Sequence, residues 1–391
     1  MREFITTESF DGPFWSSYTI LWQNSGNRSP FQSPALLQYF TREYKGRIVS
    51  LQLKKHDQLL AAALLKEADG VYGFLSDLKT DVNFFVFHEN CTKDDYTFFF
   101  SSFLKLAHQK NWSVLLNNIP SWATYIPDLE KCLTTTRLFW RNINYSVSPA
   151  IVGSSPEEFY AFATRTTKHR YAFNRLKKQL QAEFEILTDP SGIDEWFDEF
   201  YKAHILRWSN TATPSSFLKE TRQVFFRNCL EAWSKDNILV LFSVKVNGQR
   251  VGFVVGLKSS NVIIYHSTTY NTLFSKYSPT KALVYFMAGW MKENNLSVLD
   301  FGDGDESYKY QFANENQVMN RIMIAPKTNI SFIIKALIIK TVRSNRQAYE
   351  FYRNKIKKII KFTTFDLILA IQINETLTDL LTGGSSVNLT A

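Results

Sequence analysis

The chain has 391 residues, of which 45% are hydrophobic and 15% aromatic, so its composition excludes a disordered protein. A single core rarely grows beyond about 250 to 300 residues, and this length therefore predicts two domains. The net charge is +9, and no apolar stretch reaches the ~18 uninterrupted residues that a membrane-spanning helix needs.

The first half contains a predicted meander of short strands, followed by a helix and a further strand. The strands are expected at 47–53, 58–66 and 71–74, where apolar residues alternate between turn sequences. The helix is expected at 93–110 and the following strand at 112–116.

The segment 155–208 is predicted to be helical, including a basic helix at 166–182. The second half then repeats the order of the first, with strands at 238–246, 250–258 and 262–269, a helix from 278 to about 292 and a strand at 297–301. Residues 111–115 and 295–299 also share four of five letters, Asn, Ser, Val and Leu. These repeats indicate gene duplication and predict units at 1–150 and 151–330, with a helical segment at 331–391 packed on or extending the second.

The positive charge is concentrated in that last segment. Between Lys327 and Lys361 there are ten Lys and Arg residues and one acid, Glu350, so the rest of the chain sums to zero. Such a run is most often a solvated helix face. It also suits an anionic partner, and we predict peripheral contact with an anionic membrane or with a phosphorylated substrate, but no binding to DNA.

The cysteines and the first residues predict a cytoplasmic protein. Cys91, Cys132 and Cys229 are odd in number and lack metal-binding spacing, which is typical of buried thiols in a reducing compartment. The chain does not begin with a basic region that leads into an apolar run, so no signal peptide is expected.

The predicted helix of the second unit opens with Ser278 and Pro279. Serine is a favoured N-cap and proline suits the first helical position, so the amides of Thr280 and Lys281 are expected to point outward unpaired. A pyrophosphate would find free donors and the positive end of the helix dipole there. The alternative is a well-capped structural helix.

The corresponding helix of the first unit opens differently. It begins Thr92-Lys93-Asp94-Asp95, so two carboxylates lie at the positive end of its dipole and would repel a phosphate. Coenzyme binding is therefore expected in the second unit only.

A family resemblance is carried by Tyr277-Ser278-Pro279 together with the block 299–309, which includes Asp300-Phe301-Gly302-Asp303-Gly304-Asp305-Glu306 and Tyr308-Lys309. These motifs resemble those of the BioF2-like or CelD-like acyltransferases of the GNAT (Gcn5-related N-acetyltransferase) fold, which are distantly similar to the FemAB peptidyltransferases. Supporting matches lie at 30–34, 168–180 and 200–208. One departure is Thr280, where the family usually has glycine.

The resemblance implies an α/β (α+β) protein with tandem GNAT-like domains, each a mixed, mostly antiparallel sheet flanked by helices. It also implies acetyl-CoA or another acyl-CoA as the donor. The residues expected to hold the donor are Tyr277, Ser278, Pro279, Thr280, Lys281 and Ala282.

The expected chemistry is direct attack of an amine on the thioester. A helix is expected to start at the acidic loop 302–306, and Tyr308 at this start is the predicted acid. His204, or Glu306 acting through water, is the predicted base, although His204 also suits a structural role. The residues predicted to contact the substrate are Lys309, Asp303, Asp305, Arg207, Trp208 and Arg170. Lys309 could instead pair with Asp303 or Asp305, and the glycine spacing of this loop does not fit a calcium site.

The sequence thus predicts an acyl-CoA-dependent N-acyltransferase acting on an amino sugar or a cell-envelope or polysaccharide precursor. One alternative keeps the fold but uses aminoacyl-tRNA, as FemAB relatives do. Another is a non-catalytic scaffold in polysaccharide assembly.

Overall fold

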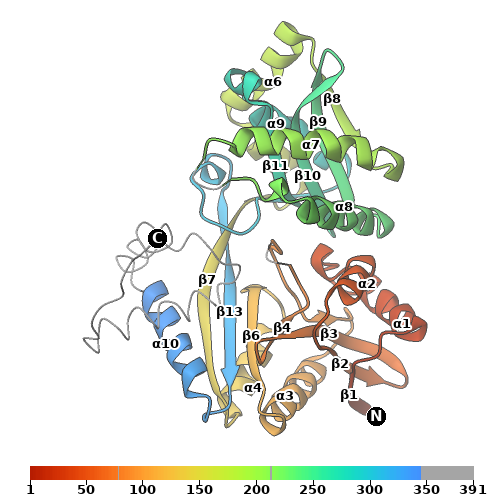
Figure 1. Cartoon of the computed structure of the whole chain (residues 1–391), viewed down its shortest axis with the longest axis vertical. Coiled ribbons are helices and arrows are strands. Elements are labelled where there is room, and N and C mark those ends of the chain that lie inside the picture. Colours follow the sequence, from red (N-terminus) through yellow and green to blue (C-terminus); the bar gives the residue numbers. More distant parts are fainter. Residues whose placement is uncertain (78, 212–213, 345–391) are drawn as a thin grey trace, which may run out of the picture.

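The computed structural model describes residues 1–344 apart from 78 and 212–213. Two units lie one above the other along the long axis of the molecule (Figure 1). The elements of the first are β1 (Arg2–Thr7), α1 (Gly12–Gln23), η1 (Pro30–Gln32), α2 (Pro34–Glu43), β2 (Ile48–Lys55), β3 (Gln58–Ala68), β4 (Val71–Phe74), β5 (Val86–Phe87), α3 (Lys93–Gln109), β6 (Ser113–Pro120), α4 (Ile126–Thr135) and β7 (Phe139–Val152).

The second unit and the end of the described chain follow. Their elements are α5 (Pro156–Thr164), α6 (Thr167–Leu180), β8 (Glu183–Leu187), η2 (Pro190–Gly192), α7 (Ile193–Trp208), η3 (Ser216–Leu218), α8 (Glu220–Lys235), β9 (Leu239–Val246), β10 (Gln249–Ser259), β11 (Val262–Tyr270), η4 (Thr272–Tyr277), α9 (Pro279–Glu293), β12 (Val298–Asp300), η5 (Lys309–Gln311), β13 (Glu315–Ala325) and α10 (Ile330–Ser344).

The repeat predicted from the sequence is present in the sheet. In each unit an antiparallel meander (β2–β3–β4 or β9–β10–β11) leads through a helix (α3 or α9) to a strand that pairs in parallel with the last meander strand. Two-residue turns of positive φ close the corresponding first hairpins of the two meanders, at His56 and Asp57 between β2 and β3 and at Asn247 and Gly248 between β9 and β10. The predicted tandem GNAT-like fold is confirmed.

Two elements differ from the prediction. The segment 155–208 is not wholly helical, because β8 pairs with β9 at the edge of the sheet. The acidic loop 302–306 does not open a long helix, since only the three-residue η5 follows it.

The units share strands, and the predicted boundaries at 150 and 330 cut across this arrangement. β13 follows the second unit in the chain but inserts between β6 and β7, while the end of β7 pairs with β12. These two long strands run between the units in Figure 1. From Glu315 onward the described chain therefore returns to the first unit.

Helix α10 contacts the first unit rather than the second. Its buried side chains, Phe332 and Ala336, pack with Ile143, Met323 and the first-unit residue Leu115, because α10 follows directly on the strand that has returned there. Ile330, Ile334 and Leu337 are exposed. Most of the basic run beyond it lies outside the described residues, so contact with a membrane stays a prediction.

No helix within the described residues is long and apolar enough to cross a bilayer. The cysteines are free thiols, of which Cys132 and Cys229 are buried and Cys91 is half-buried.

The strands of both units form one continuous sheet, and a hydrophobic core joins the units at one face of its second-unit part. Phe226 and Trp233 of α8 belong to the same buried cluster as Phe31 of the first unit. The Trp233 indole donates to the Pro30 carbonyl at 3.0 Å, and Arg222 of α8 pairs with Asp77 at 2.8 Å. The Arg222–Asp77 pair holds the first-unit loop between β4 and β5 against the second unit, beside the cleft described below.

Candidate functional site

A cleft of about 860 Å³ opens where the parallel strands β11 and β12 separate. The two strands pair only from Val262 to Ile264 and from Val298 to Asp300. Beyond this point the cleft is lined by later residues of β11 and by the loop that follows β12. In open α/β sheets, ligands bind at such carboxyl ends of strands, next to the start of the connecting helix.

The start of α9 lines this cleft, as predicted, but its details differ. Ser278 adopts a left-handed backbone conformation (φ 53°), and its side chain makes no capping hydrogen bond. The Lys281 amide is not free, because it donates to the Ser278 carbonyl at 3.1 Å. Thr280 remains in the first turn, where an α-helix offers no acceptor for the amide.

The close approach of α9 to the sheet depends on Gly252 of β10. A Cβ atom there would lie 2.8 Å from Pro279 Cβ. The helix start is therefore seated on the sheet while Thr280 and Lys281 stay partly exposed towards the cleft.

A second cavity of about 370 Å³ adjoins the helix start on its other side. It shares Ser278 and Lys281 with the main cleft and contains Tyr277, over which the Arg175 guanidinium lies at 4.6 Å. Lys168 and Lys276 add further positive charge. The two cavities together give the α9 start a strongly basic surrounding. Ala282 is fully buried and lines neither cavity, so it serves packing.

The first unit offers no comparable anion site at α3. Thr92 and Asp95 form a reciprocal capping box, and Asp95 also pairs with Arg2 at 2.6 Å. Burial alone would raise the pKa of Asp95, but hydrogen bonds from Thr92 and Arg2 lower it to about 2. A carboxylate thus occupies the positive end of this helix, as the sequence predicted.

Lys309 lines the cleft, but its ammonium group is bound to the acidic loop. It is 3% exposed, and its ammonium group donates to the carbonyls of Gly302 and Asp303, each at 2.9 Å. It also pairs with Glu306 at 2.8 Å. These bonds use its donors to hold the acidic loop in shape.

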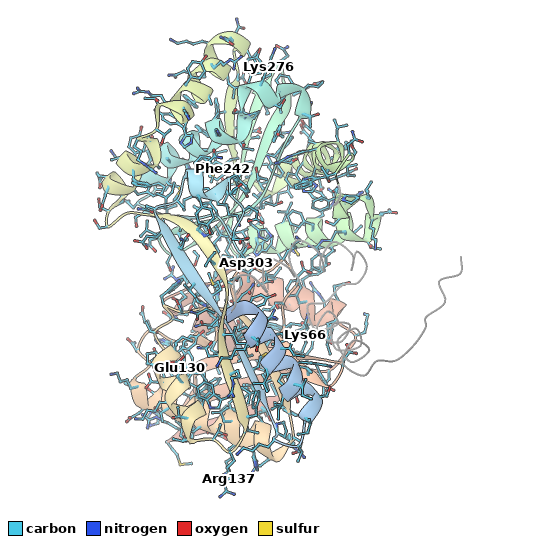
Figure 2. The ribbon with its side chains drawn as sticks, turned by 90° about the vertical axis from the view of Figure 1, so that its left-hand side faces the viewer. Lys66, Glu130, Arg137, Phe242, Lys276 and Asp303 are labelled. Carbon is cyan, nitrogen blue, oxygen red and sulfur yellow. The ribbon has the colours of Figure 1, made fainter. Side chains whose placement is uncertain are left out.

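The acidic loop presents two of its carboxylates to the cleft. Asp303 and Glu306 line it, whereas Asp305 does not. Burial raises the pKa of Asp303, whose Oδ1 atom has no hydrogen-bond partner among the described residues. Figure 2 places Asp303 at the waist between the units. Within the described chain, no cluster of metal-ligating side chains occurs.

His204 and Tyr308 both line the cleft, and burial affects the two in opposite ways. Burial, reinforced by Arg207 and Lys79, lowers the pKa of His204 to about 4. Its Nδ1 atom lies 2.8 Å from the Ser215 hydroxyl. Burial raises the pKa of Tyr308 to about 12, so its phenol is protonated at neutral pH.

The remaining predicted residues divide between the cleft and the surface. Arg207 and Trp208 of α7 line the cleft, and the Arg207 guanidinium lies 4.4 Å above the Tyr270 ring. Arg170 is exposed on α6 and lines neither cavity.

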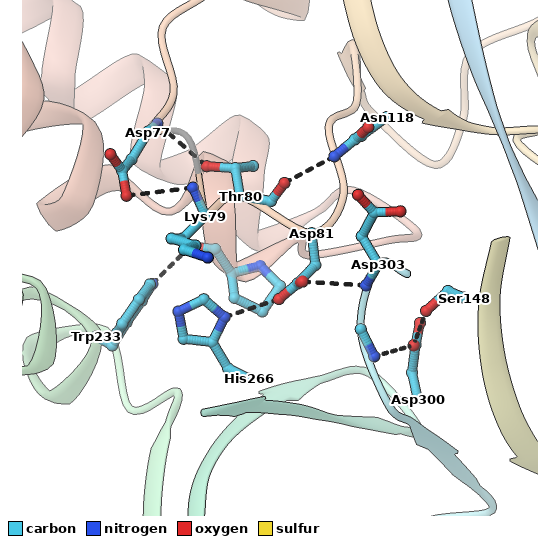
Figure 3. A network of polar contacts seen from close by, with 12 residues as sticks. Asp77, Lys79, Thr80, Asp81, Asn118, Ser148, Trp233, His266, Asp300 and Asp303 are labelled. Carbon is cyan, nitrogen blue, oxygen red and sulfur yellow. Dashed lines mark hydrogen bonds and ion pairs between the residues drawn. The ribbon is translucent and has the colours of Figure 1, made fainter. Parts of the chain in front are cut away.

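A largely buried pair that the sequence did not indicate joins the two units at the cleft. Asp81 Oδ2 lies 2.7 Å from His266 Nδ1, while Asp81 Oδ1 accepts from the Asp303 amide at 3.1 Å (Figure 3). Asp81 belongs to the first-unit loop and His266 to β11. The only local signal was a histidine within the otherwise apolar and hydroxyl-bearing strand β11.

Asp300 belongs to the motif at 299–309 and is a further buried acid, although the sequence predicted no role for it. It accepts hydrogen bonds from the Ser148 hydroxyl and from the Gly302 amide, the latter at 2.8 Å. Burial raises its pKa to about 6.

Comparisons with known proteins agree with this geometry. Residues 163–310, which hold most of the cleft, match the family model described as an acetyltransferase (GNAT) domain. The chain is therefore a protein of tandem GNAT-like fold whose second unit carries the recognisable domain.

Several solved structures share this fold. FemX is 10% identical, with a TM-score of 0.57 over 84% of this chain and 99% of that one. The C-terminal domain of a putative lysylphosphatidylglycerol synthetase from Agrobacterium fabrum is 10% identical, with a TM-score of 0.54 over 84% and 95%. A conserved protein of unknown function from Bacteroides thetaiotaomicron is 14% identical, with a TM-score of 0.51 over 82% and 99%. No curated protein matches the chain.

Proposed function

We propose that the chain transfers an acyl group from acyl-CoA to an amine. The observation that carries this proposal is that a single cleft, at the point where β11 and β12 separate, is lined by both the α9 start and Tyr308. The motifs in the second unit further suggest the BioF2-like or CelD-like subtype, and with it an amino sugar or a cell-envelope precursor as acceptor.

The donor would supply an activated thioester. The Thr280 amide and the Lys281 ammonium group would hold its pyrophosphate at the positive end of α9. Tyr308, protonated at neutral pH, would give a proton to the departing thiolate. Asp303 and Glu306 would draw a cationic amine into the cleft.

Titration with acetyl-CoA by calorimetry tests the proposal. Wild-type protein should bind with a micromolar Kd, and Lys281→Glu should weaken binding at least about 30-fold, because replacing one nearby charge by its opposite costs a few kcal/mol at a partly exposed site. Lys105→Glu makes the same charge change on the exposed face of α3 and serves as the control.

Unchanged affinity in Lys281→Glu would remove this placement of the phosphates. Absence of acetyl-CoA binding to the wild type would remove the proposed donor.

The basic second cavity supports a second candidate donor. Lys168, Arg175 and Lys276 would suit the phosphates of a nucleic acid, so an aminoacyl-tRNA donor remains compatible with the same fold. A protein that binds aminoacyl-tRNA but not acetyl-CoA would establish this candidate. Binding of neither would favour the non-catalytic scaffold.

A further inference from the structure

The first unit inserts a carboxylate into the cleft of the second. Asp81 lies on the loop between β4 and β5, and its partner His266 lies on β11, so 185 residues separate them in the sequence. The Arg222–Asp77 ion pair and a 2.9 Å hydrogen bond from the Asn118 side chain to the Thr80 carbonyl hold this loop in place. The first unit, which has no anion site of its own at α3, thus completes the second.

The pair is largely buried but borders the cleft. The side chains of His266 and Asp81 are 5% and 17% exposed, and both line the cleft. The imidazole ring lies nearly parallel to the Phe226 ring, with centroids 6.0 Å apart, and edge to face with the rings of Phe31 and Trp233, with centroids 5.4 and 5.3 Å apart. Aromatic rings on several sides fix the plane of the imidazole.

The hydrogen bonds of Asp81 fix the tautomer of His266. A carboxylate only accepts hydrogen bonds, so a neutral His266 ring must carry its proton on Nδ1 to donate to Asp81 Oδ2. The Nε2 lone pair is then unprotonated. Among the described residues Nε2 has no hydrogen-bond partner, so it is available to a substrate.

We propose that His266, oriented by Asp81 of the first unit, accepts the proton that the acceptor amine loses as it attacks the thioester. This inference rests on the function proposed above. The amine nitrogen bonds to the carbonyl carbon, its proton moves to Nε2 and the carbon–sulfur bond breaks. The thiolate takes a proton from Tyr308, which is restored from His266 through solvent, so no further reactant is needed.

The other histidine of the cleft is less suited to this step. His204 is turned towards Ser215, and its low pKa makes it a weak base at neutral pH. His266 has the arrangement of a base held by a carboxylate, in which the second nitrogen faces the reactant.

Asp81→Asn provides a specific test, because both Asp81 oxygens are in use. An amide has one acceptor oxygen, and if it takes the Asp303 amide, its NH₂ group must face His266 Nδ1. That donor would force the proton of the ring to Nε2. Nitrogen-15 NMR of histidine-labelled protein, assigned with His266→Gln, should show the Nδ1-protonated tautomer in the wild type and its reversal in Asp81→Asn.

Kinetics complete the test, with acetyl-CoA as donor, glucosamine and simple primary amines as acceptors, and thiol release as the readout. His266→Gln and Asp81→Asn should bind acetyl-CoA within about twofold of the wild-type Kd, which also shows that they fold, and lower kcat about 100-fold or more. His108→Gln, on the exposed side of α3, is the control and should keep the wild-type kcat.

The outcomes separate the two proposals. An Nε2-protonated ring in the wild type, or a kcat within about threefold of wild type in His266→Gln, would overturn the role of His266 alone. A wild-type protein that neither binds acetyl-CoA nor releases thiol would overturn the proposed function itself.

Discussion

Gly302 allows Asp81 to reach His266, and its replacement by alanine tests that contact. Gly302 has a φ of +73°, and a Cβ atom there would lie 2.8 Å from Asp81 Oδ1. The left-handed backbone would cost alanine about 1–2 kcal/mol. Displacing Asp81 would weaken hydrogen bonds to a charged group, each worth about 1.5–3 kcal/mol. Gly302→Ala should therefore lower the free energy of unfolding by about 2–5 kcal/mol.

A double-mutant cycle isolates the part that is due to Asp81. In an Asp81→Ala background the clash disappears, and Gly302→Ala should then cost only the backbone strain of about 1–2 kcal/mol. Urea denaturation of the four proteins gives the four free energies of unfolding.

Gly304→Ala is the matched control. Gly304 also has positive φ (118°), but its added Cβ would meet Glu306, a 56% exposed side chain that can turn away. Gly304→Ala should therefore lower the free energy of unfolding by the same amount with and without Asp81. If Gly302→Ala lowers the free energy of unfolding equally in both backgrounds, residue 302 does not contact Asp81. The proposed positioning of the Asp81–His266 pair would then be refuted as well.

Two further predictions concern stability. Because burial raises the pKa of Asp300 to about 6, the folded state binds its proton more tightly than the unfolded state, and this group should lower stability by on the order of 2–3 kcal/mol as pH rises from about 4 to about 6. When the free energy of unfolding is measured by urea denaturation at a series of pH values, Asp300→Asn should flatten its dependence on pH between about 4 and 6. An unchanged pH dependence would show that another group is responsible. Gly289→Ala, in the middle of α9 where nothing lies within 4 Å of an added Cβ, should add about 0.5–1 kcal/mol and raise Tm by roughly 1–3 °C, whereas a lower Tm would reveal an unfavourable contact there.

Local patterns in the sequence sufficed for the elements of both meanders and for their crossover helices. Strand β4 coincides with the predicted 71–74, and α9 begins at the predicted Ser-Pro pair. Alternating apolar residues, two-residue turns and helix-start residues are short-range signals, because they depend on the backbone geometry of neighbouring residues. The same signals distinguished the carboxylate-capped α3 from α9.

The roles of individual site residues depended on the tertiary structure. Ser278, Thr280, Lys281, Tyr308 and Lys309 do share a cleft, but the ammonium group of Lys309 is bound to the carbonyls of the acidic loop. Whether a lysine binds a ligand or a set of carbonyls depends on which backbone surrounds its ammonium group. Spacing along the chain does not contain that information.

Only the fold decided that β7 and β13 run between the units and that Asp81 pairs with His266. Strands and side chains far apart in sequence meet because the strands of both units form one continuous sheet, which must complete its hydrogen bonding and bury its apolar faces. Local sequence patterns do not indicate which distant strands or side chains will pair. The sequence by itself therefore determined the repeated unit and the position of the helix start that is proposed to bind an anion, while the tertiary structure alone determined how the first unit contributes to the cleft of the second.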